Sequence, residues 1–178
     1  KVLKESGHEW CYVVPGNYGS DFLTGTLEYD GSLAVKCSNY IGETIDDAVR
    51  IGMKGILLVG HIGKLVKLAA GVMNTHSRQA DCRMEVFAAH AALAGAGRDT
   101  VRKLMECVTT AEAVDILKGS GLLCPVMQTV MDRIDYHIRQ RAGKKLAVGA
   151  VVFSMEEGIL GSTPGAAKVL DQIRKGIR

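Results

Sequence analysis

Residues 71–85 read GVMNTHSRQADCRME and place amides, hydroxyls, a histidine and charged groups in one short stretch. Apolar sequence flanks this segment on both sides, so its side chains could line a pocket at the edge of a folded domain. The same residue types also begin helices, where one side chain accepts hydrogen bonds from free backbone N–H groups. On that interpretation Ser77 or Asp81 is only a helix cap. Composition leaves the two interpretations close to even.

Four other polar stretches each follow an apolar, strand-like run and contain glycine: PGNYGSD, SNYIGE, GHIGKL and SMEEG. In an open parallel sheet, ligands bind beyond the carboxyl ends of the strands, where helix N-termini and free backbone N–H groups converge. Glycine allows the backbone to approach a ligand closely. A single strand-to-helix turn favours glycine for structural reasons alone. Four together favour a ligand site, which we expect to be lined by Gly16, Asn17, Asn39, Gly60, His61 and Gly63.

Named phosphate-binding and metal-binding motifs are absent from these stretches. LVGHIGKL is not a P-loop, because Leu58 replaces its first glycine and Leu65 replaces the hydroxyl residue after the lysine. The five histidines show no HExxH spacing and no pairing with cysteine at ligand spacing, so we expect no metal site. His90 and His137 lie among apolar residues and are expected to be hydrogen-bonded core histidines.

The elements that must position these residues follow an α/β rhythm. Near-continuous apolar runs predict buried parallel strands at residues 9–14, 32–37, 55–60 and 145–154. Residues 41–52 carry one apolar face, and residues 63–70 precede Gly71, a typical helix stop. Residues 81–141 predict four helices in succession. We therefore expect a single α/β domain over residues 1–178, with a three-layer, mostly parallel sheet and a helical insertion before the last strand.

Local capping signals predict where the inserted and final helices begin. Asp99 is expected to cap the second inserted helix, and Thr109 to open a capping box at the third. Pro125 lies near the predicted start of the long fourth helix. In the final helix, Thr163 is expected to cap, with the proline after it in the first helical position.

Composition limits the kinds of partner. The chain has 178 residues, of which 47% are apolar, and this is enough to bury the core of one domain. Its longest apolar runs are far shorter than the about 20 residues of a membrane-spanning helix, and no signal peptide is recognised, so we expect no membrane partner. A net charge of +3 is too small to indicate nucleic acid. Five scattered cysteines predict reduced thiols in a cytoplasmic protein.

Residues 36–96, KCSNYIGETIDDAVRIGMKGILLVGHIGKLVKLAAGVMNTHSRQADCRMEVFAAHAALAGA, closely resemble the cobalt-precorrin-5B C1-methyltransferases of anaerobic cobalamin biosynthesis, the CbiD family. VVPGNYG and VVFSMEEGILGSTPGAA resemble the same family, so the resemblance covers nearly the whole chain. It implies transfer of a methyl group from S-adenosylmethionine to C1 of cobalt-precorrin-5B, giving cobalt-precorrin-6A. The family's N-terminal motif, similar to TGYTTGTCA, is absent, which implies that this chain is the C-terminal portion of a longer enzyme. The N-terminal domain of that enzyme would be its partner, and a homo-oligomer stays open.

The resemblance also implies ligands for the polar residues. Carboxylates of the tetrapyrrole substrate would pair with cations. From residue type we hypothesise that the substrate-binding residues are Lys64, Asn74, Thr75, His76, Ser77, Arg78 and Arg83, with Lys67 as a further cation. S-adenosylmethionine would occupy the glycine-lined site at the strand ends. The candidates for catalysis are His61, His76, Asp81 and Glu85, and Glu156 is a further carboxylate for the sulfonium. Cobalt enters only as part of the substrate, and His61 or His76 as its axial ligand stays open.

A second interpretation comes from a different class of protein. The chain would be a non-catalytic module that binds or assembles around the corrinoid, while the N-terminal half supplies the catalytic contacts. Methyl transfer from a sulfonium is a direct displacement that needs alignment more than a strong acid or base, so the absence of a catalytic triad fits either interpretation.

Overall fold

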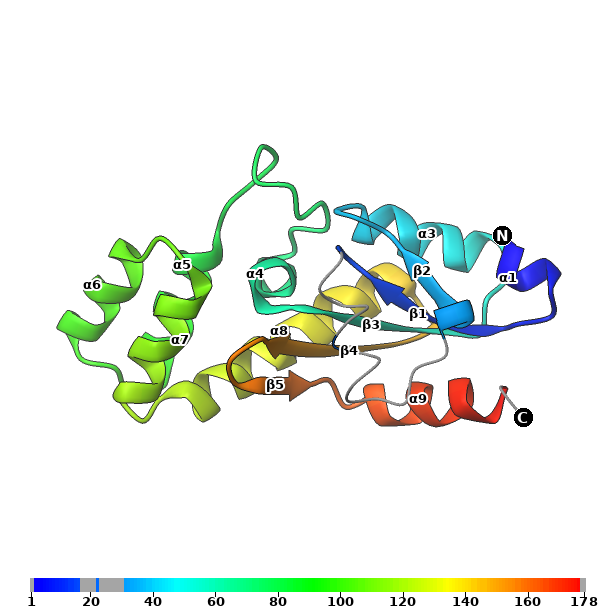
Figure 1. The fold of residues 1–178 in the computed structure, drawn as a ribbon. Coiled ribbons are helices and arrows are strands. Elements are labelled where there is room, and N and C mark those ends of the chain that lie inside the picture. Colours follow the sequence, from blue (N-terminus) through cyan, green and yellow to red (C-terminus); the bar gives the residue numbers. More distant parts are fainter. Residues whose placement is uncertain (1, 17–21, 23–30, 177–178) are drawn as a thin grey trace.

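The protein is described by a computed structural model that covers residues 2–16, 22 and 31–176 (Figure 1). Its centre is a five-stranded sheet in the order β2-β1-β3-β4-β5. The strands are β1 (Trp10–Val14), β2 (Ala34–Lys36), β3 (Gly55–His61), β4 (Ala147–Ser154) and β5 (Gly158–Ser162). The first four strands pair in parallel, and β5 pairs antiparallel to β4. The predicted α/β class with a mostly parallel sheet is confirmed.

Burial on both faces explains why the central strands are so apolar. In β3 every residue except His61 is buried, and in β4 every residue except Ala147 is buried. The two strands pair along their whole length, from Gly55 opposite Ala147 to His61 opposite Phe153. All four strands expected from apolar runs are present, at nearly the expected residues.

The fifth strand corrects the sequence-based expectation. Residues 145–154 were expected to be the last strand and to lead directly into a helix, but the chain turns at Gly158 and returns as β5. The sequence of β5 is GILGS, and most of the strand is only half-buried. Its short, glycine-rich sequence carries no continuous apolar run, which is why it was missed. The helical insertion therefore precedes the last two strands.

Helices cover the two faces of the sheet and form the expected three layers. On one face, α3 (Ile41–Arg50), the 3-10 helix η2 (Val66–Ala70) and the long α8 (Leu123–Ala142) share an apolar core with the sheet. On the other face, α9 (Ala166–Lys175) packs through Val169 against the strands. The short elements α1 (Val2–Glu5) and η1 (Gly31–Leu33) lie in the described portions of the N-terminal part.

The inserted helices form a lobe beside the sheet and share one apolar core with it. They are α5 (Arg83–Leu93), α6 (Arg98–Glu106), α7 (Thr110–Gly119) and the first turns of α8. Figure 1 shows this lobe beyond the carboxyl ends of the parallel strands, with the green loop after η2 arching above. An ion pair of 2.6 Å joins Lys118 of α7 to Glu157 in the β4–β5 turn. The four-helix succession is confirmed.

Several predicted helix ends are confirmed. The hydroxyl of Thr109 accepts a hydrogen bond of 3.2 Å from the Glu112 backbone N–H, so Thr109 caps α7 as expected. Gly71 ends η2 in the left-handed conformation at φ 78°. Pro125 occupies the first turn of α8.

Two predicted caps are wrong. The N-cap of α6 is Gly97, and Asp99 lies inside the first turn, where its charge favours the helix dipole instead. Thr163 does not cap α9, because its hydroxyl accepts a hydrogen bond of 2.9 Å from the Ala150 N–H of β4. The helix α9 begins only at residue 166. The hairpin β4–β5 gives Thr163 a strand partner that the sequence does not reveal.

A glycine fixes how closely α9 approaches the sheet. A Cβ added at Gly149 of β4 would lie 2.6 Å from the Cα of Ala166, which is backbone and cannot move aside easily. In the described ranges no helix is both long and apolar enough to cross a membrane.

Candidate functional site

The strand order places three loops at one edge of the sheet. The chain leaves β1 for β2 on one side and returns to β3 on the other, so the carboxyl ends of β2, β1 and β3 are neighbours. This switch in direction is where open α/β sheets bind ligands. We call Gly16, Ser38, Asn39, His61, Gly63, Lys64 and Thr75 the carboxyl-edge cluster.

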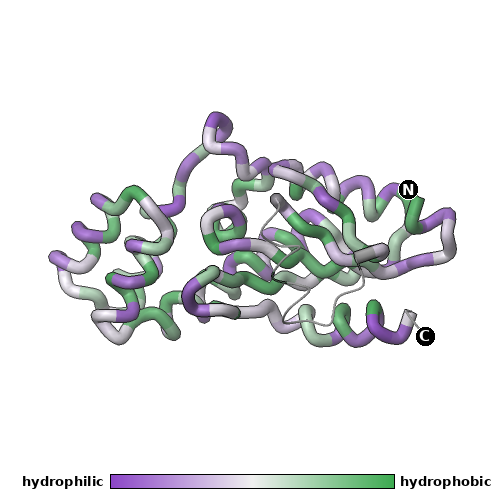
Figure 2. The backbone as a smooth tube through the Cα atoms, viewed as in Figure 1, coloured by the Kyte–Doolittle hydropathy of each residue, from purple (hydrophilic) through white to green (hydrophobic). Residues whose placement is uncertain are grey.

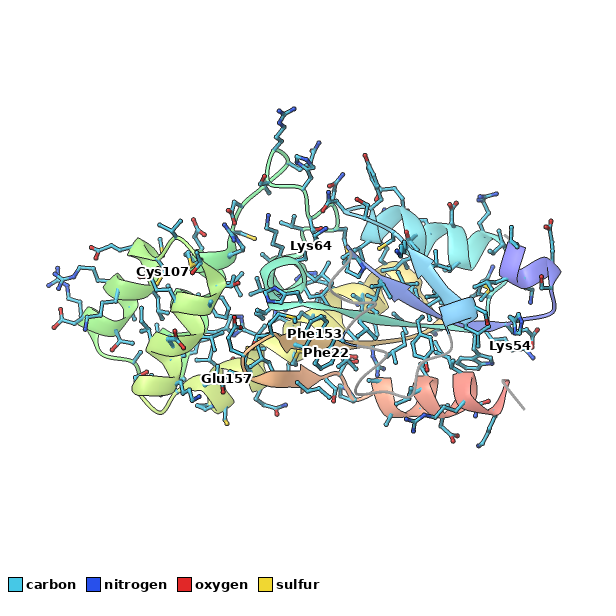
Figure 3. The ribbon with its side chains drawn as sticks, in the orientation of Figure 1. Phe22, Lys54, Lys64, Cys107, Phe153 and Glu157 are labelled. Atoms are coloured by element: carbon cyan, nitrogen blue, oxygen red, sulfur yellow. The ribbon has the colours of Figure 1, made fainter. Side chains whose placement is uncertain are left out.

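Lys64 lies at the centre of the carboxyl-edge cluster. It belongs to the short helix α4 (Ile62–Leu65), and its ammonium donates to Asn39 Oδ1 at 2.8 Å and to the Ser38 carbonyl at 3.3 Å. Figure 3 shows the side chain on α4 below the arching loop. Burial lowers the pKa of Lys64. The three loops therefore meet on one half-buried cation.

Backbone geometry supports this convergence. A Cβ added at Gly16, which has φ 91°, would lie 3.4 Å from the Lys64 ammonium. Ser38 has φ 55° and is the one non-glycine residue with positive φ in the described part of the chain. Strain of this kind costs of order 1–3 kcal/mol and concentrates at functional sites. Here it accompanies the Ser38 carbonyl that Lys64 contacts.

The thiol beside Lys64 is held neutral. Burial raises the pKa of Cys37 to about 11. A thiol with such a pKa is protonated at neutral pH, so it is a poor nucleophile. All five cysteines are free thiols, as the sequence predicts.

His61 shapes the start of α4. Its Nδ1 accepts a hydrogen bond of 3.1 Å from the Gly63 N–H. In the neutral ring this leaves the proton on Nε2. Burial lowers the pKa of His61, while the nearby Glu156 acts in the opposite direction. The Phe153 ring, near the end of β4, meets the imidazole edge-on at a centroid distance of 5.8 Å.

The start of α7 in the helical lobe approaches the same place. A Cβ added at Gly63 would lie 3.2 Å from His61 Nδ1 and 3.4 Å from the Thr110 hydroxyl. Thr110 is buried at the first position of α7. The sequence does not point to Thr110 and Phe153, because Thr110 lies at the start of a helix and Phe153 within a buried strand.

The polar segment that follows η2 is joined to the carboxyl-edge cluster. Thr75 donates its backbone N–H to the Asn39 carbonyl at 3.0 Å and its hydroxyl to Asn39 Oδ1 at 3.2 Å. Asn74 pairs with Tyr40 in an isolated antiparallel bridge. Asn39 therefore contacts both Lys64 and Thr75, which brings together two residues 11 positions apart in sequence.

Residues 76–79 form the exposed tip of this segment. Asn74 Oδ1 accepts a hydrogen bond from the His76 N–H, and His76 Nδ1 accepts one from the Arg78 N–H, both at 3.1 Å. In neutral His76 the ring proton is therefore also on Nε2. Figure 2 shows the tip as strongly hydrophilic. Ser77 belongs to this tip and not to the start of α5, so it is not the cap.

Asp81 and Arg83 pair with each other at the start of α5. The two carboxylate oxygens accept from the guanidinium at 2.8 and 2.7 Å, and Asp81 also accepts from the Arg83 N–H at 3.3 Å. The Arg83 guanidinium lowers the pKa of Asp81 to about 2. The N-cap residue of α5 is Cys82, so Asp81 does not occupy the predicted cap position. Its carboxylate still accepts a hydrogen bond from the first backbone N–H of the helix, that of Arg83. Glu85 is exposed in the first turn.

One predicted residue, Gly60, serves packing, and another is not described by the structure. Gly60 is enclosed, because an added Cβ would lie 2.9 Å from Pro15 and 3.0 Å from Leu65, so its small size serves packing. Asn17 lies outside the described residues. The described residues contain no group of three or more His, Cys, Asp or Glu side chains that could hold a metal ion.

The prediction of core histidines is confirmed for His90, whereas His137 is only half-buried and contacts an exposed arginine. His90 is buried and its Nδ1 lies 2.7 Å from the Thr129 hydroxyl. His137 is half-buried, and its ring lies against Gly71, where an added Cβ would approach to 3.1 Å. Arg133 Nη2 lies 3.0 Å from His137 Nε2.

Several surface pockets of the described residues lie away from the carboxyl-edge cluster, and two of them are considered as alternative sites. One of about 410 Å³ borders the amino end of β4 and is lined by Arg139, Lys144 and Lys168 among others. Another of about 160 Å³ lies between α1, α3 and the sheet and is mainly apolar. We prefer the carboxyl-edge cluster as the functional site, because fixed backbone, amide and ammonium groups meet there at the switch in strand order.

These features define an α/β domain of the doubly wound type, with a cluster built around the Lys64 ammonium and the Asn39 amide at the carboxyl ends of its strands. Residues 74–164 match the family model described as "CbiD, C-terminal domain", and the chain belongs to this family. The matched residues include most of the polar segment, the helical lobe and the β4–β5 hairpin.

Curated relatives extend the comparison to nearly the whole chain. A protein of Ruminiclostridium cellulolyticum is 43% identical over 173 residues, which is 94% of this chain and 45% of the relative. One of Photorhabdus laumondii subsp. laumondii is 38% identical over 98% of this chain and 47% of the relative. One of Clostridioides difficile is 38% identical over 92% of this chain and 40% of the relative. Each is named cobalt-precorrin-5B C(1)-methyltransferase, and this chain spans less than half the length of each.

Proposed function

We propose that this chain is part of a methyltransferase that acts on C1 of cobalt-precorrin-5B in anaerobic cobalamin biosynthesis. The methyl donor is S-adenosylmethionine and the product is cobalt-precorrin-6A. The observation that carries the proposal is the similarity to relatives of that name, at up to 43% identity and over up to 98% of this chain. The carboxyl-edge cluster supports the proposal, because its cation and hydrogen-bond donors suit an acidic ligand.

The reaction requires that the methyl donor and the nucleophilic carbon of the substrate be held in line. The nucleophilic carbon attacks the methyl group of the sulfonium, the S–CH₃ bond breaks with its electron pair going to sulfur, and S-adenosylhomocysteine leaves. Positioning of two reactants can account for about 7–11 kcal/mol of a barrier. A site of fixed backbone and amide groups, such as the one around Asn39 and Lys64, suits this task.

We assign the substrate's carboxylates to the cations and hydrogen-bond donors of the cluster and the exposed tip. Lys64 and Arg78 supply charge, Asn74 an amide and Ser77 a hydroxyl group. Thr75 is buried and its hydroxyl already donates to Asn39, so its share in binding is indirect. His76 offers an Nε2–H donor, which suits a carboxylate better than it suits axial cobalt ligation, since a metal needs the lone pair on that nitrogen. Arg83 is already paired with Asp81, so its share in binding is smaller.

We assign S-adenosylmethionine to the ends of β1 and β3. Gly16 and Gly63 leave the backbone accessible, and Asn39 and His61 flank it. Gly60 contributes by packing beneath these loops, and Asn17, the residue after Gly16 in the sequence, stays a candidate. Glu156 is the preferred carboxylate for the sulfonium among the candidates, because its charge acts on His61, whereas Asp81 is neutralised by Arg83. Glu85 and His76 remain further candidates for catalysis.

The relatives' additional length implies a partner segment. Because this chain covers 45% of the Ruminiclostridium cellulolyticum relative, we propose that the family's N-terminal part completes the site. We expect this chain to bind ligands more weakly by itself than together with that part.

A pair of titrations tests the proposal. This chain is titrated calorimetrically with S-adenosylmethionine and with dicyanocobyrinic acid, a cobalt corrinoid with free carboxylates; dicyanocobinamide, in which those groups are amides, is the control. We expect binding of the cofactor and of the acid, with the amide form weaker. Labelled methyl transfer is then measured with and without the N-terminal part. Absence of binding to both ligands, together with no methyl transfer in the combined system, would refute the proposal.

A further inference from the structure

A second lysine lies three residues after Lys64 and has a different environment. Lys67, in η2, is only 3% exposed. Its ammonium donates to the Thr75 carbonyl at 3.2 Å and to the Ala80 carbonyl at 2.9 Å, and it lies 3.9 Å from Asp81 Oδ1. The expectation that Lys67 meets a substrate carboxylate is therefore wrong, because its charged end is enclosed by protein.

The two carbonyls lie on either side of the exposed tip. Thr75 precedes residues 76–79 and Ala80 follows them, so one ammonium holds both ends of the tip. Thr75 is also bonded to Asn39, which in turn accepts from Lys64. The tip and the carboxyl-edge cluster are thus joined through Thr75 and Asn39.

Burying an ammonium costs several kcal/mol unless hydrogen bonds and an opposite charge replace its water. The Lys67 contacts satisfy that requirement only while the polar segment is folded back over η2. If the segment opens, the bonds to both carbonyls are lost together. A methionine at this position would fill the space but would leave the carbonyls of Thr75 and Ala80 without a donor.

We propose that Lys67 is a positioning residue: it fixes residues 75–80 over the carboxyl-edge cluster so that His76, Ser77 and Arg78 face a ligand bound there. It acts through the loop and touches no ligand. The part of this inference that concerns binding rests on the proposed function, whereas the anchoring of the loop does not.

Native-state proteolysis tests the anchoring without any ligand. Trypsin cleavage after Arg78, at the exposed tip, is followed by mass spectrometry and normalised to cleavage after Lys144, in the exposed turn between α8 and β4. We expect Lys67→Met to increase the normalised rate about 10-fold or more, on the scale of one lost charge-assisted hydrogen bond. Lys67→Arg should stay near the wild-type rate. The matched control is Lys103→Met, which removes an exposed lysine of α6 and should change nothing.

A second measurement covers the case in which Lys67→Met does not fold. Hydrogen exchange of the wild-type chain is measured at the backbone N–H groups of residues 75–80. Anchoring predicts protection well above that of a free peptide. Exchange at the free-peptide rate, or equal cleavage after Arg78 in folded Lys67→Met and wild type, overturns the proposal.

Binding separates positioning from plain stability. We expect Lys67→Met to weaken the affinity for dicyanocobyrinic acid about 10-fold, Lys67→Arg to restore it, and Lys103→Met to leave it unchanged. If the loop opens but the affinity is unchanged, Lys67 is structural and the positioning role is wrong. If the wild-type chain binds no corrinoid, either alone or together with the N-terminal part, the proposed function fails at this site, and with it the binding role, while the proteolysis still decides the anchoring.

Discussion

Lys64 offers the most direct test of the carboxyl-edge cluster. Its ammonium donates to Asn39 Oδ1 and to the Ser38 carbonyl and is the cation shared by three strand-end loops. Lys64→Met keeps most of the side-chain volume and removes the charge. The variant should therefore lose attraction for an acidic ligand while keeping the fold.

The size of the effect follows from the contacts. A hydrogen bond to a charged group contributes about 1.5–3 kcal/mol, which corresponds to about 10- to 150-fold in Kd. Lys64 is half-buried, so salt screens it incompletely. Because the ammonium already has two partners in the free protein, a ligand carboxylate gains only the difference. We therefore expect Lys64→Met to weaken the affinity for an acidic ligand by about 10-fold, the lower limit of that range.

The assay is calorimetric titration with dicyanocobyrinic acid at low salt and again at about 0.5 M salt, where the Debye length falls below about 8 Å. The difference in affinity for dicyanocobyrinic acid between wild type and Lys64→Met should be smaller at high salt than at low salt. For dicyanocobinamide the difference in affinity should be smaller at both salt concentrations. Lys103→Met controls for the loss of one positive charge. Equal affinity of wild type and Lys64→Met for the acid at low salt would show that this cluster is not where the carboxylates bind.

Three further outcomes can be checked. Gly149→Ala should destabilise the fold by about 1–3 kcal/mol in chemical denaturation, because the new methyl group meets the backbone at the start of α9; wild-type stability would contradict the packing described above. The pKa of Asp81 is lowered to about 2 by Arg83, so its contribution to stability is complete above its ordinary range near 4 and is lost as pH falls from about 4 to about 2. The stability difference between wild type and Asp81→Asn should therefore disappear over that window, and a difference that persists at pH 2 would argue against the ion pair. With a thiol reagent at pH 8, exposed Cys124 should react quickly and Cys37, with its pKa near 11, slowly; equal rates would show that Cys37 is not enclosed.

Much of the architecture could be predicted because it depends on local pattern. Strands covered on both faces need continuous apolar runs, and β3 and β4 have them. The capping box at Thr109 uses residues three positions apart, so it is visible in the sequence. The strand β5 and the role of Thr163 could not be predicted, because both depend on the hairpin partner that β4 provides.

The candidate site, like the fold, has some features that local sequence predicts and others that depend on tertiary contacts. The sequence by itself determined the α/β class, the polar loops at the strand ends and the family, because residue type and spacing carry these. Only the tertiary structure decided that β1 lies between β2 and β3, which brings Asn39 to Lys64. The tertiary structure also decided how far two lysines three residues apart are buried: Lys64 is half-buried at the cluster, whereas Lys67 is fully buried. The segment GVMNTHSRQADCRME covers Lys67 by folding back over η2, and burial of that kind depends on a contact across the chain that no local pattern records.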